Sequence, residues 1–174
     1  MKHTMPAPHP NPPPQAGEGT NDRSANISLL LADENATCAL ATRIAAKLHP
    51  GMVIYLHGDL GAGKTSLVRG ILNALGYTGR VKSPTYTLLE PYRVAGLNLK
   101  HFDLYRLQDE HEWESAGFRD EFDGQNILFI EWPEKAQSFI PPADIVVDLE
   151  ILTSGRCATL KGNTSLGRAC LKQL

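Results

Sequence analysis

A glycine-rich segment at 58–65, GDLGAGKT, matches the pattern G-x-x-x-x-G-K-[ST]. A short apolar, β-branched run at 52–57 comes directly before it and predicts a buried parallel strand. Apolar residues at three- and four-residue spacing follow at 67–75 and predict an amphipathic helix that stops at Gly76. An ordinary glycine turn is the alternative interpretation. Strand, glycine-rich turn and helix together are the context of a phosphate-binding loop, so the segment predicts such a loop.

The residue types of this segment suit a triphosphate. Gly58, Gly61 and Gly63 allow left-handed backbone conformations and a close approach of the main chain to a ligand. Successive backbone N–H groups then form a nest for anions, which the positive end of the following helix reinforces. Lys64 is expected to place its ammonium group beside the β- and γ-phosphates, and the hydroxyl of Thr65 to bind Mg²⁺.

A second strong signal ends at Glu131. The segment 126–131 carries four consecutive apolar residues between a turn at 123–124 and Pro133, which predicts a fully buried strand. Ligands of open α/β sheets bind outside the carboxyl ends of the strands, so a carboxylate there suits Mg²⁺ or its water shell. A strand-end glutamate in a surface salt bridge is the alternative.

The region between these two signals predicts an antiparallel hairpin. The later part of 81–89 is expected to form a strand, and 91–96 the connection. The segment 98–107 alternates with period two, which predicts a half-buried antiparallel strand rather than a central parallel one. Thr85 lies where many phosphate-loop proteins sense the γ-phosphate, and Asp103 is a candidate to reach Mg²⁺ directly or through water. A plain turn and a solvated aspartate are the alternatives.

The other segments complete a domain from 27 to 174. An edge strand at 27–31 is followed by a helix that Asp33 caps and that ends at Pro50-Gly51. An acidic helix is expected at 108–116. Two strands at 143–152 and 157–161, joined by a turn, and a closing helix at 164–171 come last.

Residues 1–26 differ from this domain in composition. They are rich in proline and glycine, and no apolar side chain larger than alanine follows Met5 until Ile27. Such a stretch has too little apolar surface to bury, so a disordered extension is expected.

Composition excludes two classes of function. The chain has 174 residues, a net charge of −2 and 42% hydrophobic residues, so no basic excess indicates a large nucleic-acid footprint. No apolar run approaches the length of about 18 residues that a membrane span requires. Cys38, Cys157 and Cys170 are scattered, which fits a reducing cytoplasm.

Four segments together resemble one family closely. They are GDLGAGKT at 58–65, VKSPTYTL at 81–88, HFDLYRL at 101–107 and IEWP at 130–133. Their order and spacing are similar to the TsaE (YjeE) family, the P-loop ATPases of tRNA threonylcarbamoyladenosine biosynthesis, from about residue 27 to about residue 156. The fold expected is therefore an α/β P-loop NTPase fold of three layers, with a mixed, mainly parallel central sheet and an antiparallel hairpin insertion.

The resemblance implies a nucleotide site. ATP or ADP is expected on loop residues Asp59, Leu60, Gly61, Ala62, Gly63, Lys64, Thr65 and Ser66. The residues expected to act in catalysis are Lys64, Thr65, Asp103 and Glu131, of which the last three are the expected Mg²⁺ ligands.

Further positions are implied around that site. The segment 83–85 corresponds to a switch-like loop facing the γ-phosphate, with Thr85 as its contact. Trp132 corresponds to a residue beside the site. Glu34, Thr37 and Arg156 match positions that contact the nucleotide.

The resemblance also implies partners. TsaE-like proteins act with TsaD and TsaB, of which TsaD transfers a threonylcarbamoyl group to a tRNA adenosine. TsaE is expected to hydrolyse ATP and so reset the pair between cycles, reaching tRNA only indirectly and no membrane. No arginine of the sequence is obviously placed as an arginine finger, so slow intrinsic hydrolysis that a partner stimulates is expected.

Three other functions compete with this one. A small-molecule kinase usually carries an arginine-bearing lid, and a hairpin is expected in its place. A GTPase switch usually carries an Asn-Lys-x-Asp motif, which the sequence lacks. A non-enzymatic, ATP-dependent scaffold stays open, and phosphate release by a Glu131→Ala variant distinguishes it from an ATPase.

Overall fold

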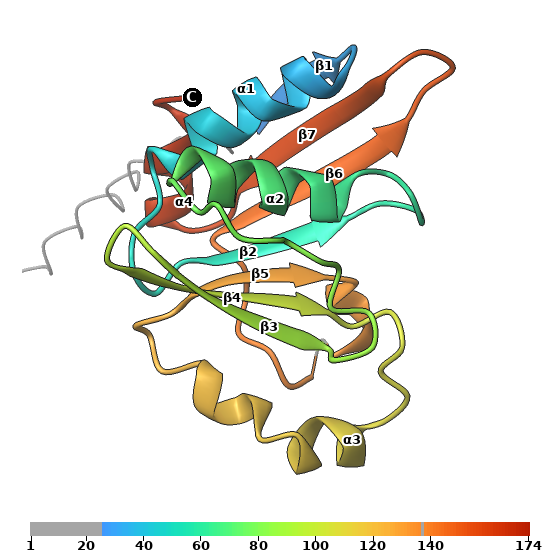
Figure 1. Cartoon of the computed structure of the whole chain (residues 1–174), viewed down its shortest axis with the longest axis vertical. Helices are drawn as coiled ribbons and strands as arrows, with labels where there is room; N and C mark the ends of the chain where they lie inside the picture. Colours follow the sequence, from blue (N-terminus) through green and yellow to red (C-terminus); the bar gives the residue numbers. More distant parts are fainter. Residues whose placement is uncertain (1–25, 137) are drawn as a thin grey trace, which may run out of the picture.

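The computed structural model describes residues 26–136 and 138–174, in which seven strands form one mixed sheet. Their order is β1-β7-β6-β2-β5-β4-β3 (Figure 1). The strands are β1 (Asn26–Leu31), β2 (Val53–His57), β3 (Leu89–Val94), β4 (Leu97–Asp103), β5 (Ile127–Glu131), β6 (Ile145–Ile151) and β7 (Arg156–Gly162). The helices are α1 (Glu34–Ala45), α2 (Lys64–Ala74), α3 (Glu110–Ser115) and α4 (Ser165–Leu171), with two short 3₁₀ helices, η1 (Phe118–Glu121) and η2 (Pro133–Lys135). The chain thus has an α/β fold.

The centre of the sheet is parallel and its edges are antiparallel. β4 pairs with β5, β5 with β2 and β2 with β6 in parallel. β6 with β7, β7 with β1 and β3 with β4 are antiparallel. The prediction of a mainly parallel sheet therefore holds only for the centre, because tight hairpins join β6 to β7 and β3 to β4, and a tight turn joins only antiparallel neighbours.

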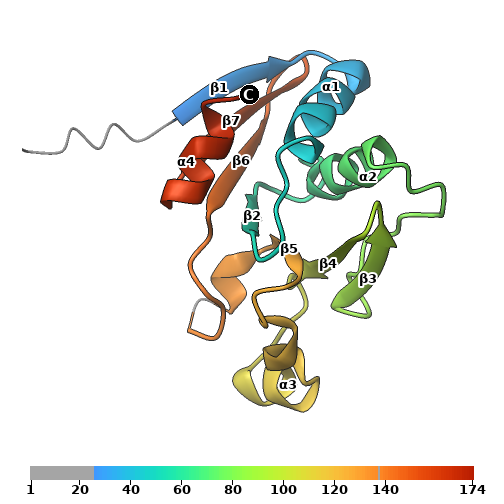
Figure 2. The ribbon, with the colours of Figure 1, turned by 90° about the vertical axis from the view of Figure 1, so that its left-hand side faces the viewer.

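Two apolar clusters lie on opposite sides of the sheet, which confirms three layers. Ile127 and Phe129 of β5 belong to the cluster that contains residues of α1, α2 and α4, while Leu128 and Ile130 belong to the cluster that contains residues of α3 and η1. Successive side chains of a strand point to opposite faces, so β5 is covered on both. α1 and α2 lie next to each other, and α3 lies far from them (Figure 2).

Local signals set the helix boundaries. The side chain of Asp33 accepts a hydrogen bond from the backbone N–H of Ala36 at 2.8 Å, so it caps α1 as predicted. The hydroxyl of Thr164 likewise accepts from the N–H of Gly167 and caps α4. Gly76 has φ +94° directly after the C-cap of α2. The predicted helices are confirmed, with ends that differ by a few residues.

The hairpin of β3 and β4 is present, but its first strand was placed wrongly. The segment 83–88 is irregular, β3 covers Leu89–Val94, and the turn is Ala95-Gly96 with φ values of +53° and +77°. Pro91 does not break β3, because β3 is the last strand of the sheet and proline is tolerated at such an edge.

The prediction of a half-buried antiparallel strand at 98–107 was only partly right. β4 ends at Asp103 and lies inside the sheet, antiparallel to β3 but parallel to β5. Leu99, His101 and Asp103 share one side of this strand and Phe102 lies on the other, yet both sides are buried, with His101 and Asp103 0% and 4% exposed. The polar positions therefore mark a site rather than a solvated face.

The predicted extension at 1–26 lies outside the described residues except for Asn26, which begins β1. Among the residues that are described, none of the helices has the length and apolarity needed to cross a membrane.

Candidate functional site

Three neighbouring strands end at the same edge of the sheet. β2 runs into the glycine-rich loop, β4 ends at Asp103 and β5 ends at Glu131. Asp103 and Glu131 are direct partners in the β4–β5 register, so the two carboxylates stand side by side. Parallel strands place their carboxyl ends together, and this brings the four sequence motifs into one region.

The loop from β2 to α2 has the backbone that its glycines predict. Gly58, Gly61 and Gly63 have φ values of +135°, +80° and +105°, which side chains with a Cβ rarely adopt. Gly63 is also the N-cap of α2, so no side chain shields the first N–H groups of this helix. The loop therefore presents main-chain donors and a helix N-terminus to the same region.

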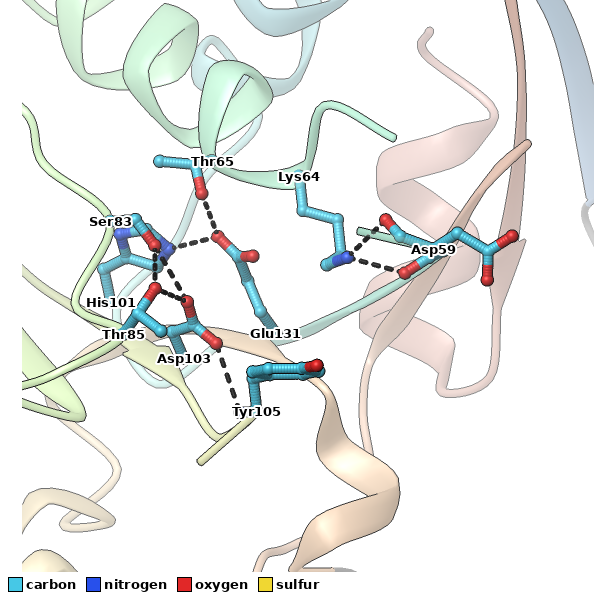
Figure 3. A network of polar contacts seen from close by, with 10 residues as sticks. Asp59, Lys64, Thr65, Ser83, Thr85, His101, Asp103, Tyr105 and Glu131 are labelled. Carbon is cyan, nitrogen blue, oxygen red and sulfur yellow. Dashed lines mark hydrogen bonds and ion pairs between the residues drawn. The ribbon is translucent and has the colours of Figure 1, made fainter. Parts of the chain in front are cut away.

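Lys64 is folded across this loop. Its side chain is buried, and Nζ donates hydrogen bonds to the carbonyl oxygens of Gly58 and Asp59 at 2.6 and 3.0 Å (Figure 3). The ammonium also lies 4.2 Å from the centre of the Trp132 ring, a cation–π contact. Burial lowers the pKa of Lys64, and the carboxylates of Glu131 and Asp103 oppose that shift.

Glu131 links three elements. Its Oε1 accepts a hydrogen bond from the hydroxyl of Thr65 at 2.8 Å and contacts Nε2 of His101 at 2.8 Å (Figure 3). Glu131 is 3% exposed and His101 is fully buried. The alternative of a surface salt bridge is excluded, since this carboxylate is held inside the molecule between α2 and β4.

Asp103 holds the irregular segment that precedes β3. Its Oδ2 accepts hydrogen bonds from the hydroxyls of Ser83 and Thr85 at 2.8 and 2.7 Å. Its Oδ1 accepts from the backbone N–H of Tyr105 at 3.2 Å. Hydrogen bonds to a charged acceptor are stronger than neutral ones, so this carboxylate fixes both hydroxyls beside Glu131.

Two cavities meet at the loop. The smaller, of about 190 Å³, lies over Lys64 and Thr65 and is lined by both carboxylates. The larger, of about 250 Å³, lies between α1 and α2. Gly63, Ser66 and Arg156 line both cavities, and Nε of Arg156 is buried with no hydrogen-bond partner among the described residues. Together they offer an elongated site with the glycine-rich loop in the middle.

Comparison with known proteins assigns the family. A model of "Threonylcarbamoyl adenosine biosynthesis protein TsaE" matches residues 31–171. The chain belongs to the TsaE family. A TsaE protein of Haemophilus influenzae is 50% identical over 127 residues, which are 72% of this chain and 80% of that protein. A TsaE protein of Rickettsia felis is 37% identical over 129 residues, 74% of this chain and 75% of that one.

A solved structure supports the same assignment. The crystal structure of YdiB from Bacillus subtilis superposes with a TM-score of 0.74 at 26% identity, over 86% of this chain and 94% of that chain. All the site residues named above lie within the segment that matches the TsaE model.

The structure brings together most of the side chains that the sequence predicted for this TsaE site. Lys64, Thr65, Asp103, Glu131 and Thr85 line the smaller cavity. Glu34, Thr37 and Ala62 line the larger one. Leu60 and Gly61 line the smaller cavity, although Leu60 is 74% exposed. Asp59 contributes its carbonyl oxygen, while its carboxylate points away from the Thr65–Glu131 contact (Figure 3).

Several residues of the site were not singled out by the sequence, and three of them stand out. His101 contacts Glu131, Tyr105 lines the smaller cavity, and Arg69 lines the larger one. A signal for His101 was present, because residues two apart on a strand share a face and His101 lies two before Asp103. No comparable signal marks Arg69, whose position depends on how α1 packs against α2.

The oxygen donors fit Mg²⁺. The hydroxyl of Thr65 and the carboxylates of Glu131 and Asp103 are hard ligands of the kind that Mg²⁺ prefers. The described residues contain no group of three or more His, Cys, Asp or Glu side chains suited to hold a metal ion by themselves.

Proposed function

We propose that this protein is a Mg²⁺-dependent ATPase with a P-loop NTPase fold that acts in the biosynthesis of tRNA threonylcarbamoyladenosine. The observation that carries the proposal is the 2.8 Å contact between Thr65 and Glu131 beside the glycine-rich loop. A hydroxyl at the start of a helix and a carboxylate at the end of the adjacent strand are the pair that positions a nucleotide-bound magnesium ion.

The main chain binds the phosphates. Backbone N–H groups of the loop and the start of α2 are the donors, and Lys64 adds one positive charge. Nζ of Lys64 exchanges the carbonyl oxygens of Gly58 and Asp59 for phosphate oxygens by side-chain rotation. Because Lys64 is buried, its charge acts on the phosphates through a medium that screens little.

Hydrolysis needs a water in line with the γ-phosphate and compensation of the developing charge. Mg²⁺, when bound, supplies positive charge to the phosphate oxygens. Thr65 and Glu131 orient it, while Ser83 and Thr85, held by Asp103, stand where the γ-phosphate or its attacking water is expected.

The larger cavity takes the nucleoside. It continues from Gly63 past Arg156 to Glu34 and Thr37 of α1. The unpartnered Nε of Arg156 is a donor for the ribose or the α-phosphate. The Asn-Lys-x-Asp guanine-reading motif is missing from the sequence, so the proposal names ATP rather than GTP.

The relatives named above are tRNA threonylcarbamoyladenosine biosynthesis proteins. We assign this chain the same role, acting in the cytoplasm with TsaD-like and TsaB-like partners and with tRNA through them. The chain alone is expected to hydrolyse ATP slowly, because Arg156, the arginine that lines both cavities, is assigned to the ribose or the α-phosphate, and partners are expected to accelerate hydrolysis.

Two variants test the proposal. Lys64→Ala is expected to abolish ATP binding, whereas Glu131→Ala is expected to keep binding and to lose phosphate release. Lys161→Ala is the control, because Lys161 pairs with Asp148 and neither residue lines the two cavities. Calorimetric titration with ATP and a phosphate-release assay, with and without the two partner proteins, are the measurements. ATP affinity that is the same for Lys64→Ala and wild type would contradict the proposal, and turnover of the isolated chain at tens per second would contradict the slow intrinsic rate.

A further inference from the structure

His101 is a buried polar side chain that has no role in the ATP binding and hydrolysis proposed for this protein. It lies on β4, two residues before Asp103, and it is 0% exposed. Its partner in the β5 register is the apolar Phe129, and the apolar cluster of α1 and α2 fills this side of the sheet. An apolar residue would suit this position equally well by packing alone.

One ring nitrogen of His101 has a partner and the other has none. Nε2 contacts Oε1 of Glu131 at 2.8 Å, whereas Nδ1 is buried without a hydrogen bond among the described residues. An unsatisfied buried polar atom destabilises the folded state. A buried histidine with such an atom is expected to have a compensating role. Glu131 is the polar side chain that the ring of His101 contacts.

The two oxygens of Glu131 are unequal as a result. Oε1 accepts from both Thr65 and His101. No hydrogen bond from the described residues reaches Oε2. Two donors from different elements, α2 and β4, therefore fix the carboxylate plane and leave one oxygen uncommitted.

We infer that His101 is a positioning residue for the magnesium ion. It holds Oε1 so that Oε2 of Glu131 faces the cation or one of its waters, and so that the hydroxyl of Thr65 keeps its lone pairs for the same cation. This inference rests on the proposed function. Groups that orient a metal ligand from behind commonly change metal affinity by about 10–100-fold when removed.

The test uses two amides of different reach. The side-chain nitrogen of glutamine lies near the position of Nε2, whereas that of asparagine lies near Nδ1. His101→Gln therefore keeps a donor for Glu131, and His101→Asn removes it. His101→Phe removes both nitrogens but still fills the core. It replaces His101→Asn in the test if the asparagine variant does not fold. ADP is the probe, so that hydrolysis does not affect the measured affinities.

The measurements are the ADP affinity in EDTA and the midpoint of a Mg²⁺ titration at fixed ADP, on the full chain. For His101→Asn and His101→Phe, the Mg²⁺ midpoint is expected to rise about 10–100-fold while the ADP affinity in EDTA stays at the wild-type value. His101→Gln is expected to stay close to wild type in both. A purely structural role would instead lower thermal stability and both affinities together.

Three results would overturn the inference. The first is an unchanged Mg²⁺ midpoint in the asparagine and phenylalanine variants. The second is an equal loss of ADP affinity with and without Mg²⁺. Either leaves the proposed function intact. The third, ADP binding by the wild-type protein that Mg²⁺ does not change, would overturn the proposed function as well.

Discussion

The hydroxyl of Thr65 donates a hydrogen bond to Oε1 of Glu131 across 2.8 Å and so joins the first turn of α2 to the end of β5. The two residues are 66 positions apart in the chain. Both sit at the carboxyl edge of neighbouring parallel strands, β2 and β5, which explains why such distant residues meet.

Removing this hydroxyl tests the metal site. Thr65→Val keeps the shape of the side chain but has no donor for Glu131 and no ligand for Mg²⁺, so Mg²⁺-dependent nucleotide affinity is expected to fall by at least about tenfold. Thr65→Ser keeps the hydroxyl and is expected to retain most of that affinity. The measurement is ATP affinity over a Mg²⁺ series. Equal effects of the two substitutions would contradict a specific role of the hydroxyl.

The contacts of Asp103 predict a role for two hydroxyls. Ser83→Ala and Thr85→Ala each remove one donor to Oδ2, a bond to a charged group worth about 1.5–3 kcal/mol when buried and less at this partly exposed site. Phosphate release is expected to fall while ADP affinity changes little, because these residues lie toward the γ-phosphate. Hydrogen exchange over 83–88 is expected to rise in both variants. Thr87→Ala is the control, since Thr87 bonds Glu90 instead.

Two glycines of the loop allow a matched comparison. Gly61 and Gly63 both have positive φ, so alanine at either position costs about 1–2 kcal/mol in backbone strain. A Cβ at Gly61 meets nothing within 4 Å, but at Gly63 it lies 3.2 Å from Nε of Arg156. Gly63→Ala is therefore expected to lower the melting temperature and the nucleotide affinity more than Gly61→Ala. Adding Arg156→Ala to Gly63→Ala is expected to recover part of the stability, as thermal unfolding would show.

Trp132 combines strain with a contact. Its φ of +58° is unfavourable for a residue with a Cβ, and its ring lies 4.2 Å below the ammonium of Lys64. Trp132→Gly and Trp132→Ala both lose the ring, but only glycine relieves the backbone. In thermal unfolding, the glycine variant is expected to be no less stable than the alanine variant, despite the greater freedom of glycine in the unfolded chain. A clearly less stable glycine variant would contradict this account.

The partly buried hydroxyl of Tyr55 leads us to expect a loss of folding stability at alkaline pH. Its hydroxyl donates to the carbonyl oxygen of Pro141, and burial raises its pKa from 10.0 to about 12. The folded state therefore holds the proton more tightly than the unfolded state, so this stabilisation is complete below pH 10 and is lost as the pH rises towards 12. Tyr55→Phe is expected to show a shallower fall in the free energy of unfolding over that range. Urea titrations at several pH values check it, and parallel curves for the two proteins would contradict it.

The glycine-rich loop was predictable because its signal is local. Positive φ at Gly58, Gly61 and Gly63, a helix starting at Lys64 and a strand just before them all follow from residues within one short segment. The same holds for the fully buried strand that ends at Glu131. Backbone sterics and hydrophobic periodicity act over a few residues, and a sequence displays them directly.

The hairpin was less predictable for a physical reason. The pattern of 98–107 does not show what covers each side of the strand. His101 and Asp103 share one side of β4 with Leu99 and are buried there, so these polar residues do not mark a solvated face. Pro91 likewise suggested a turn, although an edge position lets it stand within β3.

By itself, then, the sequence determined the loop, the strands and helices around it, and the residue types offered to a ligand. Only the tertiary structure decided that β4 lies between β3 and β5, and hence that His101 meets Glu131 and that Asp103 holds the segment 83–85. Such contacts depend on strand order and register, which are set by the burial of the whole sheet between its two layers of helices rather than by neighbours along the chain.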